Sequence, residues 1–213
     1  MINEPRVART GNPMESPARM SELSHTRGRL QFLRGFVRNP AQVGSVIPSS
    51  HRLERRLVRE AGIADARMVV ELGPGTGGTT AAFLHAMSPK SRLLAIELNP
   101  DFYGHLRASL KDSRFLLGLG SADRLEDFLA SNWLPAPDAI ISGIPFSTMP
   151  PEVADRIAAN VARLLRPGGC FVAYQVRAHV AGFMTRYLGP PRKQWEWVNV
   201  PPVRVFTWVK PEG

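Results

Sequence analysis

The sequence predicts an α/β protein in which a mostly parallel sheet is covered by helices on both faces. Three observations lead to this prediction. Short β-branched apolar runs alternate with helical periodicity between about residues 67 and 176, which is typical of βαβ units. A glycine-rich turn follows the first of these runs. The last two strand-like runs are joined by a connection too short for a crossover helix, so they should pair antiparallel.

The predicted elements follow one another in a regular order. Residues 1–25 are polar and interrupted by prolines, which predicts a flexible tail. Helical patterns at 27–39 and 50–61 precede the first strand. The expected strands are 67–72, 92–97, 114–117, 137–142, 170–176, 195–200 and 203–209. The expected helices between them are 78–87, 101–110, 124–131 and 151–165.

Composition restricts the functional classes. The chain has 213 residues, enough for one domain with a full core, and its 27 Lys and Arg exceed its 18 Asp and Glu. The net charge of +9 indicates a polyanionic partner, either nucleic acid or an anionic membrane surface. Cys170 is the single cysteine, so a disulfide framework is excluded and a reducing cytosol is expected. The sequence contains neither an apolar run long enough to span a bilayer nor a signal peptide.

The glycine-rich turn reads VVELGPGTGG at residues 69–78. Glycines at such a turn allow a tight bend and let backbone N–H groups approach a ligand. The alternative is an ordinary strand–helix turn. The next strand ends in Glu97, about twenty residues beyond the last glycine, where a carboxylate can accept both hydroxyls of a ribose.

The spacing of this turn, E-x-G-P-G-T-G, differs from the dinucleotide fingerprint and resembles motif I of the class I S-adenosylmethionine methyltransferases. Residues 164–169, LLRPGG, resemble the turn before strand five of that family. The resemblance implies one Rossmann-like domain over residues 62–213, with a seven-stranded sheet whose C-terminal strand is antiparallel. It also implies S-adenosyl-L-methionine as cofactor, S-adenosyl-L-homocysteine as product, and no metal. The residues it assigns to the cofactor are Glu71, Gly73, Gly75, Gly77, Glu97, Leu98, Ser121, Ala122 and Ser142.

One family position departs from the pattern. The family usually has G-D-A after strand three, where the aspartate contacts the adenine amine, but this chain has Gly120-Ser121-Ala122 and an acid only at Asp123. The adenine contact through Ser121 is therefore in doubt, whereas the backbone of Ala122 remains available to the ring edge.

The acceptor should bind at the end of strand four, which reads Ser142-Gly143-Ile144-Pro145-Phe146. This resembles the N-x-P-[YF] motif of methyltransferases acting on adenine or glutamine, with Gly143 in place of the asparagine. A simple Gly-Pro turn is the alternative. The predicted acceptor-binding residues are Gly143, Pro145, Phe146, Tyr174 and Arg177.

Proton removal from the acceptor needs a nearby group, because a primary amine is mostly protonated at neutral pH. Ser142, Tyr174 and His179 are the predicted catalytic residues. His51 is a further candidate for a proton relay. A core tyrosine and solvated surface histidines are the structural alternatives.

The segment at residues 27–39, RGRLQFLRGFVRN, has large apolar side chains on one arc of a helical wheel and three of its four arginines on the opposite side, while Arg29 falls within the apolar arc. A basic amphipathic helix of this kind lies in a membrane interface. The alternative is a helix docked on its own domain. We expect residues 26–61 to form amphipathic membrane-binding or lid helices. The predicted membrane-binding residues are Arg27, Phe32, Leu33, Arg34, Phe36 and Arg38.

Two more stretches narrow the resemblance. Residues 39–50, NPAQVGSVIPSS, and residues 199–205, NVPPVRV, resemble bacterial peripheral phospholipid N-methyltransferases. That family methylates phosphatidylethanolamine stepwise, through mono- and dimethyl intermediates, to phosphatidylcholine. The resemblance implies a monomer in the cytoplasm that binds peripherally to the cytoplasmic face of an anionic membrane and has no nucleic-acid partner.

Two other functions stay open. An RNA adenine N6-methyltransferase of the ribosomal dimethyladenosine type would share the fold and suit the net charge of +9. Gly143 argues against it, as does the lack of the extra C-terminal domain usual in such enzymes. A non-catalytic module that keeps the cofactor fold is the second alternative, and the intact glycine loop with Glu97 argues against it.

Overall fold

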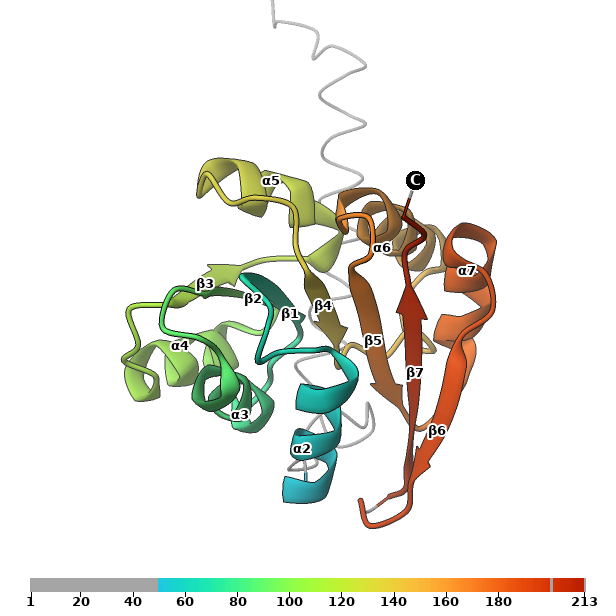
Figure 1. Ribbon diagram of the computed structural model, residues 1–213, viewed down its shortest axis with the longest axis horizontal. Helices are drawn as coiled ribbons and strands as arrows, with labels where there is room; N and C mark the ends of the chain where they lie inside the picture. Colours follow the sequence, from blue (N-terminus) through green and yellow to red (C-terminus); the bar gives the residue numbers. More distant parts are fainter. Residues whose placement is uncertain (1–49, 200, 213) are drawn as a thin grey trace, which may run out of the picture.

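The computed structural model describes residues 50–199 and 201–212 (Figure 1). Three predicted features lie outside the described residues: the tail, the amphipathic helix with its membrane-binding residues Arg27 to Arg38, and most of the stretch 39–50. The strands are β1 Met68–Leu72, β2 Arg92–Glu97, β3 Phe115–Leu119, β4 Ala139–Ser142, β5 Cys170–Gln175, β6 Arg192–Glu196 and β7 Val203–Val209. The helices are α2 His51–Glu60, α3 Gly78–Ala86, α4 Pro100–Ser109, α5 Leu125–Ser131, α6 Pro151–Leu164 and α7 His179–Leu188, with a 3₁₀ turn at Ala122–Arg124.

The seven strands form one sheet in the order β3-β2-β1-β4-β5-β7-β6. Strand β7 runs antiparallel to both of its neighbours, and the other strand pairs are parallel. The predicted α/β fold and the antiparallel C-terminal strand are confirmed. The parallel strands end at one edge of the sheet, called here the carboxyl edge, where ligands of this fold class bind.

Side chains alternate between two apolar clusters because successive strand residues point to opposite faces. On one face, Val69, Leu93 and Ile141 pack against α2 and α3. On the other face, Val70, Leu94 and Ile140 pack against α5, α6 and α7. Burial on both faces explains why β1 and β4 read as continuous apolar runs rather than as alternating ones.

Helix α2 is amphipathic, and its leucines face the domain. Leu53 and Leu57 are buried in the same cluster as Val69, while Arg52, Arg55 and Arg59 are exposed. Ser50 caps the helix by accepting a hydrogen bond from the backbone N–H of Leu53 at 3.2 Å. The apolar side of α2 is thus part of the domain core. The predicted membrane-binding or lid role of residues 26–61, which include α2, stays a prediction.

Two elements differ from the prediction. Strand β6 is Arg192–Glu196 rather than 195–200, because Trp197 to Asn199 already belong to the turn before β7. Helix α7 was not predicted. It starts soon after β5, has no side-chain cap and contains Gly182, so the sequence gives only a weak helix signal there.

Candidate active site

An open cavity lies at the carboxyl edge, with about 600 Å³ of space when the open solvent at its mouth is included. Its lining combines the turn after β1, the ends of β2 and β3, the turn after β4 and one side of α6. The lining residues are Gly73, Gly75, Ile96, Glu97, Leu98, Phe102, Gly120, Ser121, Ala122, Gly143, Ile144, Pro145, Met149, Val153 and Ile157.

The glycine turn forms the floor of this cavity. Gly73 has a φ of 74°, and a Cβ atom there would lie 2.6 Å from the side chain of Ile144. A side chain at position 73 would thus be strained by the backbone and would also collide with the turn after β4. Gly77 precedes the first residue of α3 and does not line the cavity. Of the predicted cofactor glycines, Gly73 and Gly75 reach the cavity, and Gly77 shapes the start of the helix.

Glu97 is the buried carboxylate of the cavity. Its Oε2 accepts a hydrogen bond from the backbone N–H of Gly75 at 3.0 Å, and its Oε1 accepts one from the N–H of Asn99 at 2.8 Å. Burial raises the pKa of Glu97 and outweighs these backbone donors, which lower it. Each carboxylate oxygen has a second lone pair, so the geometry fits the predicted contact with two ribose hydroxyls.

Glu71, which the resemblance assigns to the cofactor, is fully buried and is not among the residues that line the cavity. The hydroxyl of Thr79 donates to its Oε1 at 2.5 Å, and the hydroxyl of Thr80 donates to its Oε2 at 2.6 Å. Burial raises the pKa of Glu71 to about 7. The carboxylate therefore ties the end of β1 to the first turn of α3 and positions the glycine turn from below.

The side of the cavity predicted to bind adenine is mostly apolar. Leu98, Ser121 and Ala122, which were predicted to bind the cofactor, line it together with Ile96 and Phe102, which were not predicted. Asp123 does not replace the family aspartate, because its carboxylate pairs with Arg156 at 3.2 Å and lies outside the lining. An adenine ring would thus meet backbone groups and apolar side chains on this side.

The side predicted to bind the acceptor lies at the end of β4. Gly143, Ile144 and Pro145 line the cavity. Ser142 is fully buried, outside the lining, and its hydroxyl has no hydrogen-bond partner among the described residues. The side-chain amide of Gln175, a residue that sequence reasoning missed, donates to the carbonyl of Ile144 at 2.7 Å and holds the turn in place.

Tyr174 lies against Gly143. A Cβ atom built on Gly143 would lie 2.5 Å from the tyrosine hydroxyl oxygen and 2.9 Å from the ring carbon that carries it. The tyrosine hydroxyl therefore takes the space that a side chain at position 143 would need. This close approach is invisible in the sequence, where the two residues are 31 positions apart.

The remaining predicted acceptor residues do not line the cavity. Phe146 is buried in the core, with its ring centroid 6.1 Å from that of Phe183. This placement contradicts a ring that faces the acceptor directly. Arg177 and His179 are exposed just after β5, at the carboxyl edge, and His51 is exposed beside Glu54. Their roles stay predictions. Met149, Val153 and Ile157, which were not predicted, add an apolar wall from the start of α6.

Among the described residues, no cluster of His, Cys, Asp or Glu is suited to hold a metal ion. The helices of the described part of the chain include none long and apolar enough to cross a membrane.

Comparisons with known proteins agree with this geometry. A family model described as a methyltransferase domain matches residues 69–169. An ornithine lipid N-methyltransferase of Singulisphaera acidiphila is 32% identical over 141 residues, which cover 66% of this chain and 73% of that protein. A ribosomal RNA small subunit methyltransferase A of Streptomyces avermitilis is 28% identical and is covered over only 53% of its length. This chain therefore spans about half of that relative.

Solved structures share the fold. The N-methyltransferase NodS of Bradyrhizobium japonicum, in complex with S-adenosyl-L-homocysteine, superposes with a TM-score of 0.65 at 15% identity, over 87% of this chain and all of the other. An O-methyltransferase of Bacillus cereus, also with S-adenosyl-L-homocysteine, gives a TM-score of 0.64 at 14% identity, over 86% and 91% of the two chains. At these identities the likeness supports the fold and not the acceptor.

Proposed function

The chain belongs to the class I S-adenosylmethionine-dependent methyltransferases, and we propose that it N-methylates the primary amine of a membrane lipid. The proposed acceptor is phosphatidylethanolamine, methylated stepwise towards phosphatidylcholine. The observation that carries the proposal is the 32% identity to an enzyme that methylates nitrogen on an ornithine lipid, over 73% of that enzyme.

The cavity suits transfer to an amine. The bound cofactor supplies a methyl group on a positively charged sulfur, and the protein must orient a nitrogen lone pair in line with it. Ile144, Pro145 and Met149 give the acceptor side an apolar lining. Burial against such a lining disfavours a charged ammonium and lowers the pKa of the acceptor amine. The site thus promotes the neutral amine that can attack.

We propose that groups beside β4 and β5 remove the proton from the acceptor amine. The Tyr174 hydroxyl lies next to Gly143, which lines the cavity. His179 and Arg177 lie at the same edge in solvent. In our proposal Tyr174 orients the amine, His179 passes the proton to water, and Arg177 contacts the anionic part of the headgroup.

Gly143 and Tyr174 also argue against the RNA alternative. A Cβ atom at position 143 would lie 2.5 Å from the tyrosine hydroxyl oxygen and 3.1 Å from the carbonyl oxygen of Gly73, so Tyr174 would have to move before the site could hold the planar amide of the adenine-specific motif. The rRNA methyltransferases are weaker relatives, and this chain spans about half of one of them. The net charge of +9 fits an anionic membrane as well as it fits RNA.

An ornithine lipid is the second candidate acceptor, and the Singulisphaera relative favours it. Both candidates present a primary amine next to an anionic group. One is a phosphodiester and the other a carboxylate, and the apolar lining does not distinguish them.

The deciding experiment supplies labelled S-adenosyl-L-methionine and three acceptors in parallel: anionic liposomes with phosphatidylethanolamine, anionic liposomes with an ornithine lipid, and ribosomal RNA. Products are identified by mass. Methylated phosphatidylethanolamine supports the proposal, and methylated ornithine lipid alone changes the headgroup but keeps the class. Label in RNA with silent lipids refutes it. Liposomes of phosphatidylcholine, which has no N–H, and the variant Glu97→Ala give the background.

The N-terminal segment is proposed to anchor the enzyme to the cytoplasmic face of the membrane. Deletion of residues 1–39 removes the predicted amphipathic helix and leaves α2 and the cavity residues intact. We expect activity on liposomes to be lost, while the affinity for the cofactor, measured by calorimetry, falls less. Equal activity of the truncated and full chains on liposomes contradicts the anchor.

A further inference from the structure

The end of β6 and the turn that follows it carry a group of exposed apolar side chains, called here the tip patch: Trp195, Trp197 and Val198. Trp197 is 66% exposed, Val198 55% and Trp195 40%. The two indole rings stack with centroids 4.7 Å apart, and the guanidinium of Arg204 lies 4.4 Å above the Trp195 ring. Exposed tryptophans held in a fixed arrangement indicate a surface with a partner.

Strand register places the tip patch at the carboxyl edge. Gln175, the last residue of β5, pairs with Arg204 near the start of β7, and Glu196 pairs with Val203. The described residues between the two strands, 197–199 and 201–202, therefore lie past the end of β5, on the edge that holds the cavity (Figure 1). Two other exposed apolar side chains share this edge, Leu119 at the end of β3 and Val176 after β5.

The surroundings of the tip patch are basic. Arg52, Arg177 and Lys193 are exposed on the elements that border it. Glu196, the acid within the hairpin, is buried and paired with Arg56 at 2.9 Å and Arg52 at 3.6 Å, so its charge is neutralised inside the fold. Exposed indole rings with cations on the neighbouring elements suit binding to an anionic bilayer. Tryptophan prefers the level of the lipid headgroups, and each nearby cation is attracted to the anionic surface.

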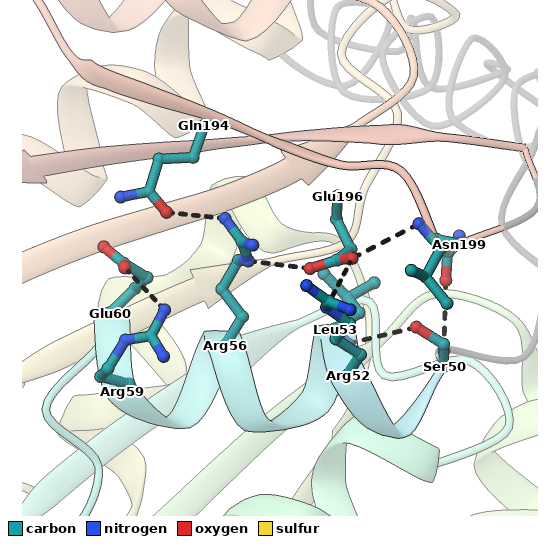
Figure 2. A network of polar contacts seen from close by, with 10 residues as sticks. Ser50, Arg52, Leu53, Arg56, Arg59, Glu60, Gln194, Glu196 and Asn199 are labelled. Atoms are coloured by element: carbon teal, nitrogen blue, oxygen red, sulfur yellow. Dashed lines mark hydrogen bonds and ion pairs between the residues drawn. The ribbon is translucent and has the colours of Figure 1, made fainter.

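The buried contacts around Glu196 also fix the tip patch to the start of α2 (Figure 2). Arg56 donates to the side-chain oxygen of Gln194 at 2.8 Å. The side-chain oxygen of Asn199 accepts from the backbone N–H of Ser50 at 3.1 Å. Ser50, the first described residue, therefore lies beside the tip patch, at the same edge as the cavity.

We propose that the tip patch is a second membrane contact, which inserts Trp197 and Val198 into the headgroup region of an anionic bilayer and turns the cavity towards the lipid. It would act beside the predicted helix at residues 27–39. The inference rests on the proposed function only in taking a membrane lipid as the acceptor, and it concerns residues outside the catalytic cavity.

The test measures binding of the full chain to vesicles of phosphatidylglycerol and phosphatidylcholine, without any primary amine or methyl donor. The variant Trp197→Ser/Val198→Ser makes the tip polar. We expect the lipid concentration for half-maximal binding to rise about tenfold or more, because two apolar side chains lose their burial. Trp133→Ser is the matched control, since Trp133 is 95% exposed but precedes β4, at the opposite edge of the sheet. Equal binding of the tip variant and the wild type overturns the proposal.

A second measurement uses conservative variants that keep the apolar surface. Brominated lipids in the bilayer should quench tryptophan fluorescence in the wild type and in Trp133→Phe, and should quench less in Trp197→Phe. Quenching that falls in Trp133→Phe instead overturns the proposal. RNA binding of the variant Trp197→Ser/Val198→Ser is measured in parallel. If this variant loses binding to RNA but still binds vesicles like the wild type, the proposal is overturned. Because these vesicles contain no acceptor, a protein that binds them through the tip but methylates no lipid would refute the proposed function alone.

Discussion

On the β1–β2 side of the carboxyl edge, Glu71 and Glu97 place every carboxylate oxygen on a hydrogen-bond donor. On the β4–β5 side, the buried hydroxyl of Ser142 has no partner among the described residues, and the lining beside it is apolar. The first side is held rigidly by its own contacts, which suits a cofactor shared by the whole family. In our proposal the second side holds the acceptor through shape and burial, so the identity of the acceptor would depend on a few close contacts.

The largest expected effect is on cofactor affinity, from a substitution on the β1–β2 side of the carboxyl edge. Glu97→Ala should weaken binding of S-adenosyl-L-methionine by roughly 2–4 kcal/mol, because it removes a charge-assisted pair of hydrogen bonds to ribose. It also frees the N–H of Gly75, which Glu97 holds at 3.0 Å. Calorimetric titration measures the change. Asp101→Ala is the control, because Asp101 is an exposed carboxylate at the start of α4. An unchanged dissociation constant for Glu97→Ala would show that the ribose lies elsewhere.

The same side can be tested through the pH dependence of the free energy of unfolding, to which Glu71 contributes. Its folded pKa of about 7 lies above the ordinary value of 4.5, so the folded state holds the proton more tightly than the unfolded state. Stability is therefore greatest below pH 4.5 with respect to this group and declines as pH rises to about 7, by roughly 3 kcal/mol at most. Glu71→Gln should flatten this decline in urea unfolding between pH 5 and pH 8. The raised pKa of Glu97 acts with the same sign and leaves a residual slope. Parallel curves for the variant and the wild type would contradict this account.

On the acceptor side, the sharpest test concerns Gly143 and Tyr174. Gly143→Asn should lower the free energy of unfolding by about 1–3 kcal/mol, because its side chain overlaps the tyrosine hydroxyl. Tyr174→Ala in the same chain should relieve this cost, so the two changes together should be less damaging than their sum. Urea unfolding of the two single variants and the double variant measures the coupling. Additive losses would mean that the two residues do not compete for the same space.

The sequence predicted best where local pattern and spacing agree. The strand at residues 92–97 and the acid at its end are found as expected, because an apolar run ending in Glu97 admits few other structures. The position of the cavity follows from the parallel topology, and Gly73, Gly75, Ser121 and Ala122, whose role in binding the cofactor stays a prediction, are among the residues that line it.

What could not be predicted depends on contacts between distant residues. The pairing of Glu71 with Thr79 and Thr80 removes it from the cavity lining, and no spacing rule indicates this. Phe146 turns into the core against Phe183 because α7, which the sequence barely signals, lies there. The approach of Tyr174 to Gly143 depends on the register of β5 against β4, which only the folded sheet determines.

The smallest expected effect compares two buried serines. Ser142→Ala should leave the free energy of unfolding unchanged or raise it by up to about 1 kcal/mol, because its hydroxyl is buried without a partner among the described residues. Ser91→Ala is the matched control and should lower stability by about 1 kcal/mol, because the Ser91 hydroxyl donates to the carbonyl of Ala66 at 2.6 Å. If Ser142→Ala slows methyl transfer without destabilising the fold, its hydroxyl is held for a ligand. A loss of stability as large as that of Ser91→Ala would mean that Ser142 has a structural partner and that the two sides of the edge are built alike.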